Sequence, residues 1–235
     1  CFGNGKVIGA ILFEKTMDGM SGGKPVPERL AERGVVPFLK VDKGLEDEAN
    51  GVQLMKPMPD LESLLARAKA KGVFGTKMRS VIKSNDAEGI AAVVRQQFAE
   101  GARIIAAGLM PILEPEYDIK AADRGEGEQV LLAEILKGLD ALPEGQQVML
   151  KLSIPTVDDF YAPLIAHPRV LRVVALSGGY PRAEANERLS RQHGMIASFS
   201  RGLTEGLRVS MSDEEFNTSL GATIDQICAA SVNKV

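Results

Sequence analysis

One lysine of the sequence stands inside a segment that otherwise reads as a buried strand. Lys151 occupies the middle of "VMLKLSIP", residues 148–155, whose other members are mostly apolar and whose last residue is a proline. Burial of an ammonium group is costly and favours the neutral amine. A neutral lysine amine attacks carbonyl groups and forms Schiff bases with them. Lys151 is therefore a candidate nucleophile toward a carbonyl substrate.

Further charged, hydroxyl and glycine residues lie near the C-terminal ends of successive apolar runs. They are Lys40 with Asp42, Lys77 with Arg79, Glu114 with Glu116, Lys151 with Ser153, Ser177 with Gly178 and Gly179, and Ser200 with Arg201. Residues two apart on a strand point the same way, so the side chains of such a pair lie on one face of the sheet. In a parallel barrel the C-terminal strand ends converge on the face where active sites are built.

The kinds of side chain indicate the chemistry. An excess of lysine and arginine over carboxylate suits a phosphorylated substrate. A carboxylic acid such as Glu114 could move protons while a Schiff base forms. The "LSGG" segment offers backbone N–H groups that can hold a phosphate. We expect no metal and no cofactor, because His167 and His193 lack partners at a ligand spacing.

Each of these residues also has a structural interpretation. Lys151 could extend its amine to the surface, and Glu114 could be a surface or helix-capping acid. The pair Lys77 and Arg79 could form a solvated face, and the glycine pair could be an ordinary turn. Because the same arrangement recurs on six runs, we favour the functional interpretation.

Apolar runs alternate along the chain with longer helical patterns, which predicts βαβ units and a parallel sheet. The predicted strands are 7–13, 35–41, 73–79, 110–115, 148–154, 172–178 and 196–200. The predicted helices include 60–71, 86–107, 125–140, 157–166 and 181–191.

The predicted fold class is α/β, a (β/α)8 TIM barrel that forms a single domain over residues 1–235. Neither GxGxxG after the first strand nor GxxxxGK[ST] occurs, which disfavours a nucleotide-binding open sheet. The barrel has eight strands, so we expect the first one to be missing from this chain, which does not begin with methionine. Such a barrel has an unpaired strand edge that favours self-association, so a homo-oligomer is an expected state.

Composition excludes several classes of protein. A net charge of −3 argues against a nucleic-acid partner. We expect no membrane partner, because no apolar run reaches the ~18 residues of a membrane span. The first residues lack a signal-peptide pattern, and the 2 cysteines lie far apart without a CxxC motif. The predicted location is therefore the cytoplasm.

Taken together, the motifs resemble class I fructose-1,6-bisphosphate aldolase in its bacterial branch. They are "GAILFEKTMD", "KVDKG", "GTKMRSVI", "PILEPE", "MLKLSIP", "LSGG" and "SFSRGL". The resemblance runs from about Val7 to the C-terminal "SVNKV". It implies a metal-free Schiff-base aldolase that cleaves the phosphosugar fructose 1,6-bisphosphate to dihydroxyacetone phosphate and glyceraldehyde 3-phosphate.

The resemblance also implies a role for each matched residue. Lys151 corresponds to the Schiff-base lysine and Glu114 to the proton-transfer residue. The remaining roles are a charged pair beside that lysine and a substrate phosphate (Lys77, Arg79), positioning of hydroxyl groups and charge (Lys40, Asp42) and a C1-phosphate cradle (Ser177, Gly178, Gly179, Ser200, Arg201). The family carries a further aspartate on its first strand that assists carbon–carbon cleavage, and that strand is expected to precede Cys1.

Two alternatives stay open at this point. Another Schiff-base barrel, such as a transaldolase or a deoxyribose-phosphate aldolase, would use a similar lysine. A non-catalytic phosphosugar-binding or scaffold protein would explain the expected absence of the first strand. An upstream strand with an aspartate would remove the basis for the second alternative.

Overall fold

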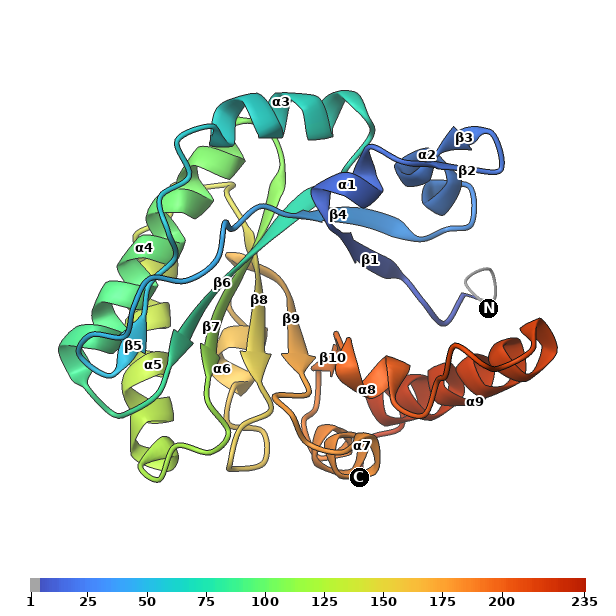
Figure 1. The fold of residues 1–235 in the computed structure, drawn as a ribbon. Coiled ribbons are helices and arrows are strands. Elements are labelled where there is room, and N and C mark those ends of the chain that lie inside the picture. The colour runs from blue at the N-terminus through green and yellow to red at the C-terminus, as the bar shows by residue number, and fades with distance from the viewer. Residues whose placement is uncertain (1–4) are drawn as a thin grey trace.

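A curled sheet of parallel strands dominates the computed structural model, which describes residues 5–235 (Figure 1). In spatial order its strands are β1 (Gly9–Leu12), β4 (Val36–Lys40), β6 (Gly75–Ile82), β7 (Met110–Tyr117), β8 (Val148–Ser153), β9 (Val170–Leu176) and β10 (Ile196–Ala197). A short strand, β5 (Val52–Gln53), pairs antiparallel with the end of β6. Within the described residues, β1 and β10 are the two edges of the sheet.

Helices connect the strands and cover the outer face of the sheet (Figure 1). They are α1 (Glu14–Met17), α2 (Val26–Ala31), α3 (Leu61–Ala70), α4 (Ala87–Ala106), α5 (Arg124–Asp140), α6 (Ala162–Ile165), α7 (Arg182–Ser190), α8 (Arg201–Thr204) and α9 (Asp213–Val232). A small hairpin of β2 (Met20–Ser21) and β3 (Lys24–Pro25) lies between α1 and α2. Alternating strands and helices around a curled parallel sheet are the arrangement of a (β/α)8 barrel.

The core lies between the strands and this outer layer, and α4 shows how it is built. The side chain of Asp86 caps the helix by accepting from the backbone N–H of Gly89 over 2.8 Å. Val93, Val94 and Ile104 then recur at helical spacing and are buried. This apolar stripe packs on β6 and β7, whose alternate side chains point to the opposite, inner face of the sheet.

The seven strands predicted from the sequence are confirmed, but their ends differ in four cases. Strand β9 ends at Leu176 and β10 at Ala197, so Ser177 to Gly179 and Ser200 with Arg201 follow their strands instead of ending them. Lys77 with Arg79, and Glu114 with Glu116, were expected to end their strands. Instead β6 continues to Ile82 and β7 to Tyr117. The reason is that β5 pairs with the last residues of β6, and β7 follows β6 in register over this extension.

The helix prediction was less complete. Residues 157–166 form mainly turns, and only α6 is α-helical there. No bounds were predicted for the long helix α9, although Ser212 and Glu215 form a capping box at its start. No helix within residues 5–235 combines the length and the apolar character that a membrane crossing requires. Cys1 lies outside the described residues.

Candidate active site

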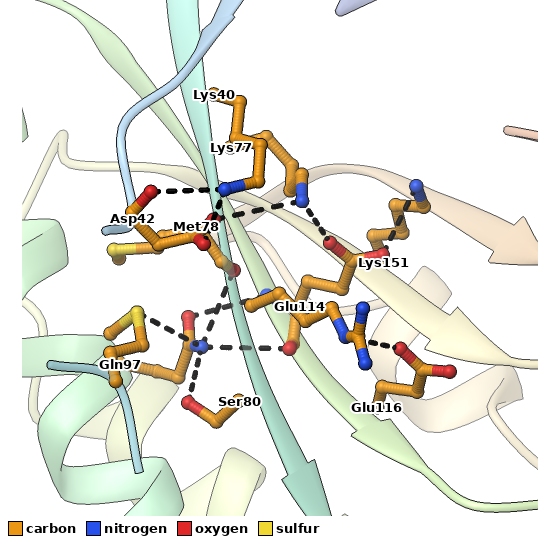
Figure 2. A network of polar contacts seen from close by, with 11 residues as sticks. Lys40, Asp42, Lys77, Met78, Ser80, Gln97, Glu114, Glu116 and Lys151 are labelled. Carbon is orange, nitrogen blue, oxygen red and sulfur yellow. Dashed lines mark hydrogen bonds and ion pairs between the residues drawn. The ribbon is translucent and has the colours of Figure 1, made fainter. Parts of the chain in front are cut away.

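Four residues from adjacent strands and Asp42, which follows β4, form one chain of alternating charge on the inner face of the sheet (Figure 2). Lys40 Nζ contacts Asp42 Oδ1 at 2.6 Å, and Asp42 Oδ2 lies 3.7 Å from Lys77 Nζ. Lys77 Nζ lies 2.8 Å from Glu114 Oε2, and Glu114 Oε1 lies 3.0 Å from Lys151 Nζ. The carboxylate of Glu114 thus lies between two lysine amines.

Strand register explains why these side chains meet. Lys40 on β4 lies opposite Lys77 on β6, and Arg79 on β6 lies opposite Glu114 on β7. The β7–β8 pairing places Lys151 one residue beyond the last paired position, beside Glu114. A parallel ladder therefore brings residues from four strands to one place, although they are far apart in the sequence.

Burial gives this cluster unusual electrostatics. The exposed fractions are 8% for Asp42, 7% for Lys77, 3% for Glu114 and 8% for Lys151. Charges in such surroundings interact more strongly than in water. Asp42 Oδ2 and Glu114 Oε2 have no hydrogen-bond partner among the described residues, so the contacts of Lys77 with them are ion pairs. Both oxygens can accept a hydrogen bond from a substrate hydroxyl.

A buried glutamine on α4 supports the acid of this cluster (Figure 2). Gln97 Oε1 accepts from the backbone N–H of Glu114 at 3.2 Å, and its Nε2 donates to Ser80 Oγ at 2.9 Å. One side-chain amide therefore bridges β6 and β7 at the level of the site. Gln97 is not among the residues predicted for the site, although a polar residue on an apolar helix face was a usable signal.

Beside the cluster, Arg79 Nε contacts Glu116 Oε2 at 2.7 Å. Burial raises the pKa of Glu116, and the nearby positive charge of Arg79 acts in the opposite direction. The charges of Lys151 and Arg201 also reach Glu116. The pKa of Glu116 therefore responds both to the buried cluster and to Arg201.

The glycine turn after β9 forms a second group of site residues. Ser177 is buried, and Gly178 and Gly179 have φ angles of 63° and 113°, which favour glycine. A Cβ placed on Gly179 would lie 3.5 Å from Arg201 Nη1, so this guanidinium lies against the turn. Ser200 is exposed at the start of α8 and makes no side-chain cap.

An open cavity of about 420 Å³ lies against this turn. Its lining residues are Gly179, Tyr180, Pro181, Arg201, Thr204 and Glu205. Backbone N–H groups and an arginine at one cavity can hold a phosphate. Within residues 5–235, no group of three or more histidine, cysteine, aspartate or glutamate side chains is placed to hold a metal ion.

Comparisons with known proteins give the family. A family model described as fructose-bisphosphate aldolase class-I matches residues 3–141. Two relatives are named fructose-bisphosphate aldolase class 1. The one from Porphyromonas gingivalis is 56% identical over 232 residues, which are 98% of this chain and 78% of the relative. The one from Synechocystis is 55% identical over 232 residues, which are 98% of this chain and 77% of the relative.

A solved structure has the same fold at low sequence identity. It is fructose-bisphosphate aldolase from Plasmodium falciparum in complex with TRAP and a small molecule inhibitor. The TM-score is 0.82 at 22% identity, and the match covers 99% of this chain and 80% of that chain. The likeness shows the barrel fold, and the sequence matches show the family. The chain belongs to the class-I fructose-bisphosphate aldolase family.

Proposed function

We propose that this protein reversibly cleaves fructose 1,6-bisphosphate to dihydroxyacetone phosphate and glyceraldehyde 3-phosphate through an imine on Lys151. The observation that carries the proposal is the 3.0 Å contact between Lys151 Nζ and Glu114 Oε1 in a buried site. Membership of the family supports the reaction. The arrangement of the strand residues supports the roles that follow.

Lys151 is the nucleophile in this proposal. Its neutral amine adds to the C2 carbonyl of the ketose and forms a carbinolamine. Glu114 gives a proton to the carbinolamine hydroxyl, which leaves as water, and the imine remains. The protonated imine accepts the electron pair of the C3–C4 bond when that bond breaks. Breaking this bond leaves an enamine on Lys151, which takes up a proton at C3 and becomes an imine again. Hydrolysis of that imine releases dihydroxyacetone phosphate and restores the amine.

The other lysines and Asp42 prepare this site. Lys77 contacts the second oxygen of Glu114 and so keeps that carboxylate oriented toward Lys151. The pair Lys40 and Asp42 presents to substrate hydroxyls an amine and a carboxylate oxygen that accepts no hydrogen bond from the described residues. We assign no residue of the described chain to removal of the C4 hydroxyl proton, which the family resemblance gives to an aspartate on another strand.

Two regions of positive charge suit the two phosphates of the substrate. We assign the C1 phosphate to the backbone N–H groups of Ser177, Gly178 and Gly179, together with Arg201 and Ser200. We assign the second phosphate to Arg79, whose partly exposed guanidinium contacts Glu116. Arginine binds phosphate with two parallel hydrogen bonds, which makes it suited to both positions.

We place this reaction in the cytoplasm. Within the described residues Cys228 is a free thiol. Low cysteine use without a disulfide framework suits a reducing compartment. The substrate is a small phosphosugar, and no other partner is needed for the chemistry.

Release of dihydroxyacetone phosphate from fructose 1,6-bisphosphate, measured with a chelator present, tests the proposal. The purified protein should release it at the same rate with and without EDTA. Lys151→Met should abolish the release, whereas Lys43→Met, which alters an exposed lysine paired with Glu14, should not change it. Release that EDTA abolishes, or that survives Lys151→Met, would contradict the imine mechanism.

A further inference from the structure

Tyr180 closes the glycine turn. Its backbone N–H donates to the carbonyl of Ser177 over 2.9 Å, which defines a four-residue turn with Gly178 and Gly179 at its centre. Both central residues have positive φ angles, 63° and 113°. Glycine pairs are conformationally free in an isolated chain, so a turn of this kind needs an external restraint to keep its N–H groups in place.

The side chain of Tyr180 supplies two such restraints. Its hydroxyl accepts a hydrogen bond from Arg124 Nη1 over 3.1 Å. The guanidinium of Arg188 stacks over its ring, with 4.5 Å between Cζ and the ring centroid. The first partner lies on α5 and the second on α7. The turn is therefore attached through one side chain to the two helices beside it.

Arg124 is itself fixed within the protein. It is 4% exposed, and its Nε donates to Glu128 Oε1 over 2.9 Å. Its Nη2 donates to the backbone carbonyl of Ile154, the residue that follows β8. Glu128 is fully buried, and its second oxygen accepts from the backbone N–H and the hydroxyl of Thr156 at 3.0 and 2.6 Å. Tyr180 is thus connected to the strand of Lys151 by a hydrogen-bonded ion pair.

This pair does not take part in the chemistry of the site described above. Buried ion pairs contribute little to stability compared with apolar residues of similar size, because both charges lose their hydration. The pair Arg124–Glu128 does, however, give Arg124 one fixed orientation, with its Nη1 toward Tyr180. That geometry points to a role in placement of the turn.

We propose that Tyr180 is a positioning residue that holds the Ser177–Gly178–Gly179 turn ready for a substrate phosphate, through Arg124. The proposal rests on the proposed function only for the identity of that phosphate group. A held turn binds phosphate without first losing conformational freedom, whereas a loose turn loses that freedom on binding. Tyr180 therefore governs affinity for the phosphate and not the reactivity of Lys151.

The sequence provides a matched control. Tyr161 is 1% exposed, and its hydroxyl has no hydrogen-bond partner within the described residues. Tyr161→Phe therefore removes the same atom as Tyr180→Phe without breaking a hydrogen bond. Comparison of the two variants separates the loss of the Arg124 hydrogen bond from any general effect of removing a tyrosine hydroxyl.

Two measurements test the proposal. In a Lys151→Met background, where no imine can form, calorimetry gives the Kd for dihydroxyacetone phosphate. We expect Tyr180→Phe to raise this Kd about fivefold, as the loss of one hydrogen bond predicts, and Tyr161→Phe to leave it unchanged. With Lys151 intact, borohydride trapping of unphosphorylated dihydroxyacetone should proceed equally in wild type and Tyr180→Phe.

An equal Kd in the two tyrosine variants would overturn the proposal. So would a Tyr180→Phe protein that traps unphosphorylated dihydroxyacetone less well than wild type, because the defect would then not concern the phosphate. If the wild-type protein forms no adduct with dihydroxyacetone phosphate or with dihydroxyacetone, the proposed function is contradicted instead. The calorimetric comparison would still decide the role of Tyr180, since it does not depend on an imine.

Discussion

Gln97 on α4 accepts a hydrogen bond from the backbone N–H of Glu114 on β7, with 3.2 Å between Oε1 and the nitrogen. The same amide donates to Ser80 Oγ on β6 over 2.9 Å. Gln97 is 1% exposed, and water does not substitute readily for its partners. The placement of the proposed proton-transfer residue therefore depends on a helix in the outer layer as well as on the sheet.

Gln97→Met keeps the volume of this side chain but removes its hydrogen bonds, including those to Ser80, to the carbonyl of Met78 and to the N–H of Glu114. The hydroxyl of Ser80 and the N–H of Glu114 then lose a buried partner, so the free energy of unfolding should fall by about 1–3 kcal/mol. Urea unfolding of this variant, compared with Gln226→Met on the exposed face of α9, measures the difference. Equal stability of the two variants would mean that the bridge contributes nothing.

Glu114→Gln removes the carboxylate that lies between Lys77 and Lys151. We expect kcat to fall by about 10²- to 10⁴-fold, the range for loss of a general acid or base. Glu116→Gln is the matched comparison, because Glu116 contacts Arg79 and makes no ion pair with either lysine. Steady-state kinetics should show a change mainly in KM for that variant. A Glu114→Gln enzyme within twofold of the wild-type kcat would assign the proton transfer elsewhere.

Gly178→Ala should destabilise the glycine turn by more than the cost of backbone strain, because the new side chain also clashes with a neighbour. The new Cβ would lie 2.4 Å from Ile119 Cγ2, and the φ angle of 63° already disfavours alanine. Gly145→Ala is the control, since its φ is 81° but nothing lies within 4 Å of the added carbon. Both variants should lose about 1–2 kcal/mol to strain, and Gly178→Ala should lose more and raise KM. An unchanged KM in Gly178→Ala would mean that the turn does not contribute to substrate binding.

Lys234 predicts a dependence of stability on pH. Burial lowers its pKa from 10.5 to about 8, while Asp159 acts in the opposite direction. Between these two values the unfolded chain binds more protons at this residue than the folded protein, so stability should rise as pH increases from about 8 to 10.5. Chemical unfolding of wild type and Lys234→Met over this range gives the free energy of unfolding of each protein. That of the wild type should increase relative to that of Lys234→Met as the pH rises. A difference that is constant with pH would contradict the lowered pKa.

Much of the fold could be predicted because the strands are short apolar runs and side-chain alternation fixes their faces. The adjacent placement of Lys77, Glu114 and Lys151 follows from the same logic, since parallel strands bring equivalent positions together. Strand ends were predicted less well. The extension of β6 to Ile82 depends on pairing with β5, and a contact of this kind has no local signal in the sequence.

The supporting residues of the site were harder to find. Gln97 and the pair Arg124–Glu128 act through contacts with residues 17 to 56 positions away. Their residue types alone allow many surface roles. Burial distinguishes these residues from surface glutamine, arginine and glutamate, and burial is known only once the helices are packed on the sheet. The motif residues, in contrast, carried their chemistry in their own types and spacing.

The most direct test of the account is borohydride trapping with dihydroxyacetone phosphate. The purified protein is incubated with this ketone, reduced and digested, and the modified peptide is identified by mass. We predict a single reduced adduct, on Lys151, and its loss in Lys151→Met. An adduct on Lys77 or Lys40 instead, or none on the folded protein, would contradict the assignment of Lys151 as the imine-forming residue.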